Sequence, residues 1–97
     1  MSILDKLFGK KERTAAEIAL SGEYLLSQKK LNQALKEFNT AISMEPENDL
    51  FYFSRSKVKK EMKNYEAAME DIDYALKLQP EVKIYQNFKN EIIKAKI

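Results

Sequence analysis

The chain has 97 residues, of which 44% are hydrophobic and 33% charged, and it contains two glycines and two prolines. That length suits one domain, and the composition favours helices, so we expect an all-α fold. Cysteine and histidine are absent, which excludes disulfides, thiol nucleophiles, imidazole bases and the zinc sites built from them. The net charge of +2 gives no general case for binding nucleic acid or an anionic membrane.

Residues 1–13 form an amphipathic N-terminal segment ahead of a predicted domain at residues 14–97. Charged residues interrupt its apolar ones, so we expect no signal-peptide core, no membrane-spanning run and a cytoplasmic protein. The segment could cap the first helices, pair with a second copy, touch a membrane through its lysines or fill a binding groove. A cap is favoured because an open repeat needs cover. The apolar residues of the segment are Ile3, Leu4, Leu7 and Phe8.

The first two predicted helices cover the chain from residue 14 to Pro46. The first begins with Thr14 and Glu17, three residues apart, which is the spacing of a capping box, and it runs to about residue 28. The second is expected to have Asn32 as its N-cap and to end before Pro46, because the residue before a proline disfavours the α conformation. Its apolar residues have the spacing that lines one helix face. They are Ala34, Leu35, Phe38, Ala41 and Ile42.

Three further helices are predicted in the second half of the chain. Asn48 or Asp49 caps the first of them, which ends near residue 63. Asn64 caps the next, which ends before Pro80. The segment 81–97 predicts a terminal helix that covers the exposed side of the preceding pair. Its apolar residues at helical spacing are Val82, Tyr85, Phe88 and Ile92.

The helices repeat with a period of 34 residues, the distance between Pro46 and Pro80. Upstream of both prolines, like residues pair at the same offset, which indicates two copies of one helix-turn-helix unit. We expect repeat one at residues 15–48, repeat two at 49–82 and a capping helix at 83–97. The matching pairs are Lys29 with Lys63, Leu31 with Tyr65, Ala34 with Ala68, Leu35 with Met69, Phe38 with Ile72, Ala41 with Ala75, Ile42 with Leu76 and Met44 with Leu78.

The unit resembles the tetratricopeptide repeat, whose pattern is W-x2-L-G-x2-Y, then A-x3-F, then A and P. The resemblance covers about two units and implies an α-solenoid of two helix-turn-helix repeats with a C-terminal capping helix. The first copy fits at Ile18, Gly22, Leu25, Ala34, Phe38, Ala41 and Pro46, and departs at Ser21. The second fits at Tyr52, Ser56, Ala68, Ile72, Ala75 and Pro80.

Two positions of the second copy depart from the family pattern. Arg55 and Lys59 stand where the family normally has apolar residues. We therefore expect the first helix of repeat two to pack with a shifted face that uses Val58 and Met62.

The resemblance implies a protein-protein interaction module rather than an enzyme. In the family, the first helix of each unit lines a concave face that binds extended or helical peptides, so we expect an adaptor that holds a segment of a partner protein. Some members clamp a C-terminal carboxylate with Lys and Asn, but three of the matching positions here carry other residues, which disfavours such a clamp. The expected groove residues are Ala19, Glu23, Leu26, Leu50, Phe53, Ser54, Lys57 and Lys60.

The two helices of repeat two have opposite charge. Residues 49–64 carry five basic and two acidic residues, net +3, and residues 65–78 carry one basic and four acidic residues, net −3. This pattern favours a basic inner face and a partner with acidic and apolar groups. The alternative is that the two helix faces neutralise one another.

Other classes of function have less support. No catalytic residue, metal ligand or cofactor site is predicted, because the acidic residues of segment 65–78 are expected on a solvent face. The balanced charge argues against nucleic acid, although lysines cluster at 57–63. A second possibility is a structural protein that forms homo-oligomers through an exposed repeat end. The acidic residues considered for catalysis are Glu66, Glu70, Asp71 and Asp73.

Overall fold

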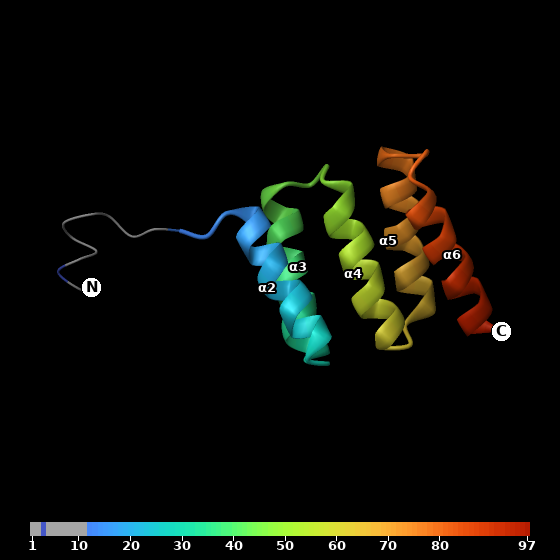
Figure 1. Ribbon diagram of the computed structural model, residues 1–97, viewed down its shortest axis with the longest axis horizontal. Helices are drawn as coiled ribbons and strands as arrows, with labels where there is room; N and C mark the ends of the chain where they lie inside the picture. Colours follow the sequence, from blue (N-terminus) through green and yellow to red (C-terminus); the bar gives the residue numbers. More distant parts are fainter. Residues whose placement is uncertain (1–2, 4–11) are drawn as a thin grey trace.

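The computed structural model describes residue 3 and residues 12–97. That part of the chain is built from helices and contains no strand, which confirms the predicted all-α solenoid. Figure 1 shows the helices standing side by side in chain order, with α2 and α3 at one end and α6 at the other. Their bounds are α2 Ala15–Ser27, α3 Leu31–Met44, α4 Asp49–Glu61, α5 Tyr65–Leu78 and α6 Lys83–Lys96.

Side-chain caps start three of the helices, as expected from the sequence. Thr14 and Glu17 form the predicted capping box on α2: the Thr14 hydroxyl accepts from the Glu17 amide at 3.1 Å, and the Glu17 carboxylate accepts from the Thr14 amide at 3.2 Å. Asn48 caps α4 by accepting from the Leu50 amide at 3.1 Å. Asn64 caps α5 by accepting from the Ala67 amide at 3.3 Å. Each cap satisfies an amide that has no partner within its helix.

The predicted cap at Asn32 is wrong. Helix α3 begins at Leu31, with Lys30 at the N-cap position and no side-chain cap, so Asn32 lies inside the first turn. The turns before α3 and α5 explain this start, because Lys29 and Lys63 both have positive φ, 59° and 63°. A left-handed residue ends each preceding helix, and the next helix follows two residues later.

Helix α4 packs on the first helix pair in the same way that α6 packs on the second. Val58 of α4 is fully buried in one core cluster with Ala34 and Phe38 of α3. Ile92 of α6 is fully buried in a cluster that contains Ile72 of α5. The terminal helix therefore buries an apolar flank of α5, which is the role expected of it.

Gly22 marks the closest approach within the first helix pair. A Cβ atom at this position would lie 2.8 Å from Cζ of Phe38, and that ring is fully buried. In the second pair the equivalent residue is Ser56, whose hydroxyl donates to the Ala68 carbonyl at 2.7 Å. Both positions need a small residue because the facing helix leaves no room for a larger one.

The shifted face predicted for α4 is wrong in part. Val58 is buried, but Met62 is 38% exposed. Arg55 and Lys59 keep the positions that apolar residues occupy in the family, because Asp71 of α5 binds both of them. The Asp71 carboxylate accepts from Nε and Nη2 of Arg55 at 2.8 and 2.7 Å, and it lies 2.9 Å from Nζ of Lys59.

The same contact corrects the position predicted for Asp71. This residue is 4% exposed and faces α4, so it does not belong to the solvent face. Its three acidic neighbours on the helix, Glu66, Glu70 and Asp73, are exposed as expected. The hydrogen bonds that Asp71 accepts raise the pKa of Arg55 above its ordinary value, because they stabilise the charged guanidinium.

Candidate functional site

A hollow of about 350 Å³ lies between the first helices of the two units, α2 and α4. It brings together four of the eight predicted groove residues, Ala19, Glu23, Leu50 and Ser54. Leu50 is 58% exposed, so a bound side chain can reach it. The hollow also contains three residues that the sequence analysis missed, and its lining is mostly apolar. The missed residues are Ala16, Leu20 and Phe51.

The 34-residue period could have identified two of the missed residues. Ala16 stands 34 positions before Leu50 and Leu20 stands 34 positions before Ser54, and both Leu50 and Ser54 were predicted to face the groove. Equivalent positions of equivalent helices face the same side of a solenoid. Phe51 is largely buried, at 6% exposure, and it joins the hollow from the core beneath.

Glu23 lies at the polar end of the hollow and connects α2 to α4. Its carboxylate accepts a hydrogen bond of 2.5 Å from the Ser54 hydroxyl and bonds of 3.1 and 3.2 Å from Nζ of Lys57. Ser54 is buried at 8% exposure. These hydrogen bonds satisfy the Glu23 carboxylate and the Ser54 hydroxyl, and they link α2 to α4.

Phe53, Lys57 and Lys60 continue the inner face from the hollow toward α6. The Phe53 ring packs against Tyr85 and Phe88 of α6, with centroids 5.0 and 5.4 Å apart. Nζ of Lys57 lies 4.9 Å from the centroid of Phe53, and Nζ of Lys60 lies 5.9 Å from that of Phe88. Phe53 is therefore part of the packing between α4 and α6 as well as of the inner face.

Leu26 is not among the residues that line the hollow. It is partly buried against the cluster formed by Ala34, Phe38 and Val58. The structure thus divides the predicted groove into three parts: the hollow, the cationic and aromatic surface next to α6, and Leu26 on the core.

The charge of the inner face is lower than the sequence count suggests. Arg55 and Lys59 are paired with Asp71, and Lys57 is paired with Glu23. Within the described part of the chain, Lys60 makes no ion pair with a carboxylate within 4.0 Å. The ion pairs with Asp71 and Glu23 involve three of the five basic residues counted in segment 49–64.

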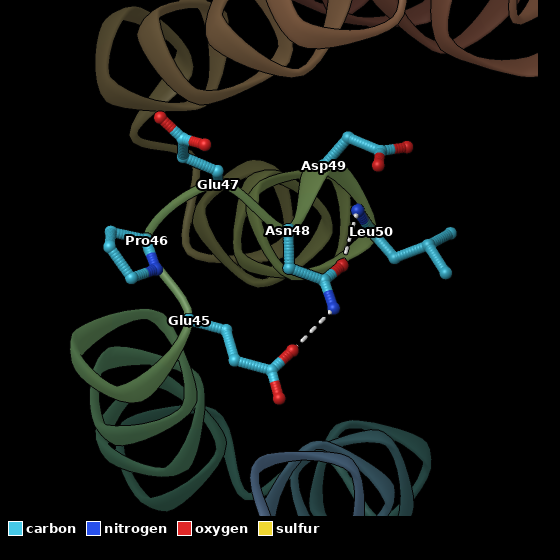
Figure 2. Close-up of a pocket in the computed structure, with 6 residues that line it drawn as sticks. All are labelled: Glu45, Pro46, Glu47, Asn48, Asp49 and Leu50. Atoms are coloured by element: carbon cyan, nitrogen blue, oxygen red, sulfur yellow. Dashed lines mark hydrogen bonds between the residues drawn. The ribbon is translucent and has the colours of Figure 1, made fainter.

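A second and more open hollow, of about 690 Å³, lies over the turn between α3 and α4 (Figure 2). Figure 2 shows the Asn48 side chain bridging this turn, since it donates to the Glu45 carboxylate at 3.0 Å and accepts from Leu50. The Tyr52 hydroxyl donates to the Pro46 carbonyl at 2.7 Å. These polar groups serve the turn and the helix cap.

Tyr85 of α6 contacts the same turn. Its hydroxyl donates to the carboxylate of Asp49, the first residue of α4. Burial of the ring and this hydrogen bond raise the pKa of the Tyr85 hydroxyl above its ordinary value, so it stays a donor. The contact adds a polar connection between α4 and α6 to the apolar packing of Phe53.

The described residues contain neither a candidate metal site nor a candidate membrane-spanning helix. Over residue 3 and residues 12–97, no cluster of three or more acidic side chains is placed to hold a metal ion. Over the same residues, no helix is both long enough and apolar enough to cross a membrane.

Repeated antiparallel helix pairs with an apolar hollow on the inner side define a helical-repeat protein-interaction module. The family model "Tetratricopeptide repeat" matches residues 18–48 and 51–82. The chain therefore belongs to the tetratricopeptide repeat family, and the resemblance noted in the sequence is confirmed.

One relative is similar over most of this chain. It is the Hsp70-Hsp90 organising protein of Plasmodium falciparum (isolate 3D7), which is 35% identical over 89 residues. The aligned region covers 87% of this chain and 15% of that protein, so the chain spans only a small part of its relative's length. No solved structure matches the chain significantly.

Proposed function

We propose that this protein is a cytoplasmic, non-enzymatic adaptor that holds a peptide segment of a partner protein against α2 and α4. The observation that carries the proposal is the apolar hollow between these helices, with the exposed Leu50 on its wall. A family whose members bind proteins, and a relative whose printed name describes an organiser of Hsp70 and Hsp90, support a protein partner.

The partner segment is expected to combine an apolar side chain with an acidic one. The apolar side chain enters the hollow beside Leu50, and the acidic one meets Lys60, an inner-face lysine with no carboxylate partner among the described residues. Leu50 and Lys60 are ten positions apart on one helix, which is about 15 Å at 1.5 Å per residue. An extended peptide covers that distance in about four or five residues.

A chaperone tail held by a carboxylate clamp is not the favoured ligand. Glu23 and Ser54 stand at positions where the resemblance requires Lys or Asn. Glu23 is already bound by Ser54 and Lys57. Its negative charge would also repel a terminal carboxylate. The proposal therefore takes from the relative only the general role of binding a protein segment.

The affinity of one such segment is expected to be modest. Helix α2 and helix α4 have 13 residues each, so each is about 20 Å long. A peptide across two helices of this length buries little surface, and a dissociation constant of the order of micromolar is expected.

The proposal can be tested with peptides selected from a random display library on the folded protein. Binding of the selected peptides is then measured by fluorescence anisotropy for the wild type and for two groove variants, Leu50→Asp and Lys60→Glu. Both altered side chains are at least partly exposed, so the fold should survive. The matched control is Lys36→Glu, an exposed change on α3 away from the hollow.

We expect Leu50→Asp to weaken every selected peptide by about tenfold or more, equivalent to about 1.4 kcal/mol. Lys60→Glu should weaken only the peptides that carry an acidic residue, and Lys36→Glu should change nothing. If the selected peptides bind Leu50→Asp as tightly as the wild type, the hollow is not the site. If no peptide is selected at all, the adaptor role loses its support.

A further inference from the structure

Helix α6 repeats, at the 34-residue period, the two side chains of α4 on which the proposed peptide site depends. Ile84 stands 34 positions after Leu50, and Lys94 stands 34 positions after Lys60. Ile84 is 57% exposed and Leu50 is 58% exposed. Equivalent positions of equivalent helices face the same side of a solenoid, so Ile84 and Lys94 extend the inner face onto α6. The cap expected at the other end, residues 1–13, lies almost wholly outside the described residues.

The contacts of α6 with its neighbours show which of its sides adjoins α4. On one side, Lys89 pairs with Asp73 of α5, with 2.8 Å between Nζ and Oδ1. On another side, Phe88 packs against Phe53 of α4, with ring centroids 5.4 Å apart. Ile84 precedes Phe88 by four residues, a spacing that places two side chains next to each other on a helix. Ile84 therefore lies on the side of α6 that adjoins α4.

Large side chains make the surface between α4 and α6 different from the hollow between α2 and α4. The small residues Ala19 and Ser54 line the hollow. The residues 34 positions after them are Phe53 and Phe88, whose rings meet edge to face. Two small side chains leave space for a ligand group, whereas two phenyl rings fill it. We call Phe53, Ile84 and Phe88 the α4–α6 surface, and it offers an apolar floor instead of a second hollow.

Two lysines border the α4–α6 surface at one end. Nζ of Lys60 lies 5.9 Å from the ring centroid of Phe88, and Lys94 follows Phe88 by six positions on α6. Among residues 12–97, neither lysine has a carboxylate within 4.0 Å. Glu91, an exposed residue three positions before Lys94, opposes them, but two basic groups and one acidic group still sum to +1. This end of the surface therefore favours an acidic ligand group.

We propose that α6 is a second wall of the peptide site, with Ile84 and Phe88 as apolar contacts and Lys94 as a second cation. The inference rests on the proposed function, since it concerns the same partner segment. That segment lies over the α4–α6 surface, with apolar side chains at Leu50 and Ile84. Its acidic side chains meet Lys60 and Lys94. Each apolar residue is ten positions from its lysine, about 15 Å along the helix, so one extended segment of four or five residues serves both helices.

The partner that fits this surface is an extended segment of another protein, with two apolar residues at one end and two acidic residues at the other. Successive side chains of an extended segment point to opposite sides, so one member of each pair meets α4 and its neighbour meets α6. The Phe53 and Phe88 rings supply apolar area between the two rows. A single acidic residue would leave one of the two lysines without a partner.

The test uses the full-length protein and the peptides selected from the display library. Their binding is measured by fluorescence anisotropy for the wild type, Ile84→Asp and Lys94→Glu. The matched control is Ile93→Asp, the same change on the same helix at a residue that is 43% exposed. Ile93 is nine positions from Ile84, which places it on the opposite side of the helix at about 100° per residue. Circular dichroism checks that each variant is folded.

We expect Ile84→Asp to weaken the peptides by about fivefold or more, because a charge replaces an apolar contact, and Ile93→Asp to change nothing. Lys94→Glu should weaken the acidic peptides by roughly two- to fivefold, and this effect should disappear when the acidic residues of the peptide are replaced by amides. If Leu50→Asp weakens the peptides and Ile84→Asp acts no more strongly than Ile93→Asp, α6 is not a wall of the site and the proposed function stands. If Leu50→Asp has no effect, the hollow is not the site and both proposals fail.

A second measurement covers the case in which Ile84→Asp disturbs the packing of α6. The unchanged protein is labelled at its isoleucine methyl groups, and nuclear Overhauser effects from a bound peptide are recorded by NMR. We expect contacts to the Ile84 methyl and none to the Ile93 methyl, and the reverse result would refute the assignment. Light scattering tests for a second copy on this face: a mass above that of one chain that falls in Ile84→Asp would give the surface to self-association instead.

Discussion

The change that tests the packing between α4 and α5 most directly is Asp71→Leu. Asp71 is 4% exposed and binds both Arg55 and Lys59, whose side chains are only 20% and 19% exposed. Removing the carboxylate leaves two largely buried cations without their opposite charge, and breaking a buried pair in this way costs about 3 to 5 kcal/mol. We expect the lower end of that range, about 3 kcal/mol, because Asn39 still accepts from Arg55 at 3.0 Å.

The assay is thermal unfolding followed by far-ultraviolet circular dichroism, supported by urea titration. A loss of about 3 kcal/mol lowers the Tm of a domain of this size by roughly 12 to 24 °C. The control is Glu70→Leu, the same kind of change at an exposed position of the same helix. It should alter stability by no more than about 0.5 kcal/mol.

A triple variant distinguishes the removal of Asp71 alone from the replacement of the whole ionic cluster. Arg55→Leu and Lys59→Tyr, combined with Asp71→Leu, restore the apolar residues that the family pattern has at two of these positions. Replacing a buried ionic cluster by apolar residues is often neutral or stabilising by about 1 to 4 kcal/mol, so the triple variant should be at least as stable as the wild type. The reasoning is refuted if Asp71→Leu costs no more than Glu70→Leu, or if the triple variant is as unstable as Asp71→Leu alone.

Two further changes test the close helix contact and the turn. Gly22→Leu should destabilise the protein by about 1 to 3 kcal/mol in urea titration, because even a Cβ atom would lie 2.8 Å from the Phe38 ring; an equal loss for Leu at the exposed Ala16 would contradict this. Lys63→Gly should stabilise the protein by about 0.5 kcal/mol. The change removes a strain of roughly 1 to 2 kcal/mol, which a side chain at positive φ causes, and it adds an entropic cost of roughly 0.5 to 1 kcal/mol for glycine. Lys36→Gly, within α3, should instead destabilise by about 1 kcal/mol in the same assay, and a loss at both positions would exclude relief of strain at Lys63.

Helix boundaries were largely predictable because they depend on neighbouring residues. The capping box at Thr14 and the caps at Asn48 and Asn64 are local hydrogen bonds, and the prolines end helices by local steric conflict. The N-cap prediction at Asn32 was wrong because it relied on residue type alone and not on the 34-residue period. The residue 34 positions before Asn64 is Lys30, and that is where the helix cap lies.

The candidate site was predictable only as a list of positions. The repeat register places equivalent residues on one face, and four of the eight predicted residues line the hollow. Which of them remain available for binding depends on partners from other helices. Lys57 is occupied by Glu23, and Phe53 is packed on α6, and neither contact follows from a pattern within one helix.

The sequence by itself determined the class of fold, the helices and the period, because apolar spacing, caps and prolines act over a few residues. Only the tertiary structure decided how the unusual charges are used. Arg55 and Lys59 lie on α4 and Asp71 lies on α5, and their pairing depends on how those two helices meet. The same packing leaves Leu50 exposed beside the hollow. Among the described residues, it also leaves Lys60 without a carboxylate within 4.0 Å.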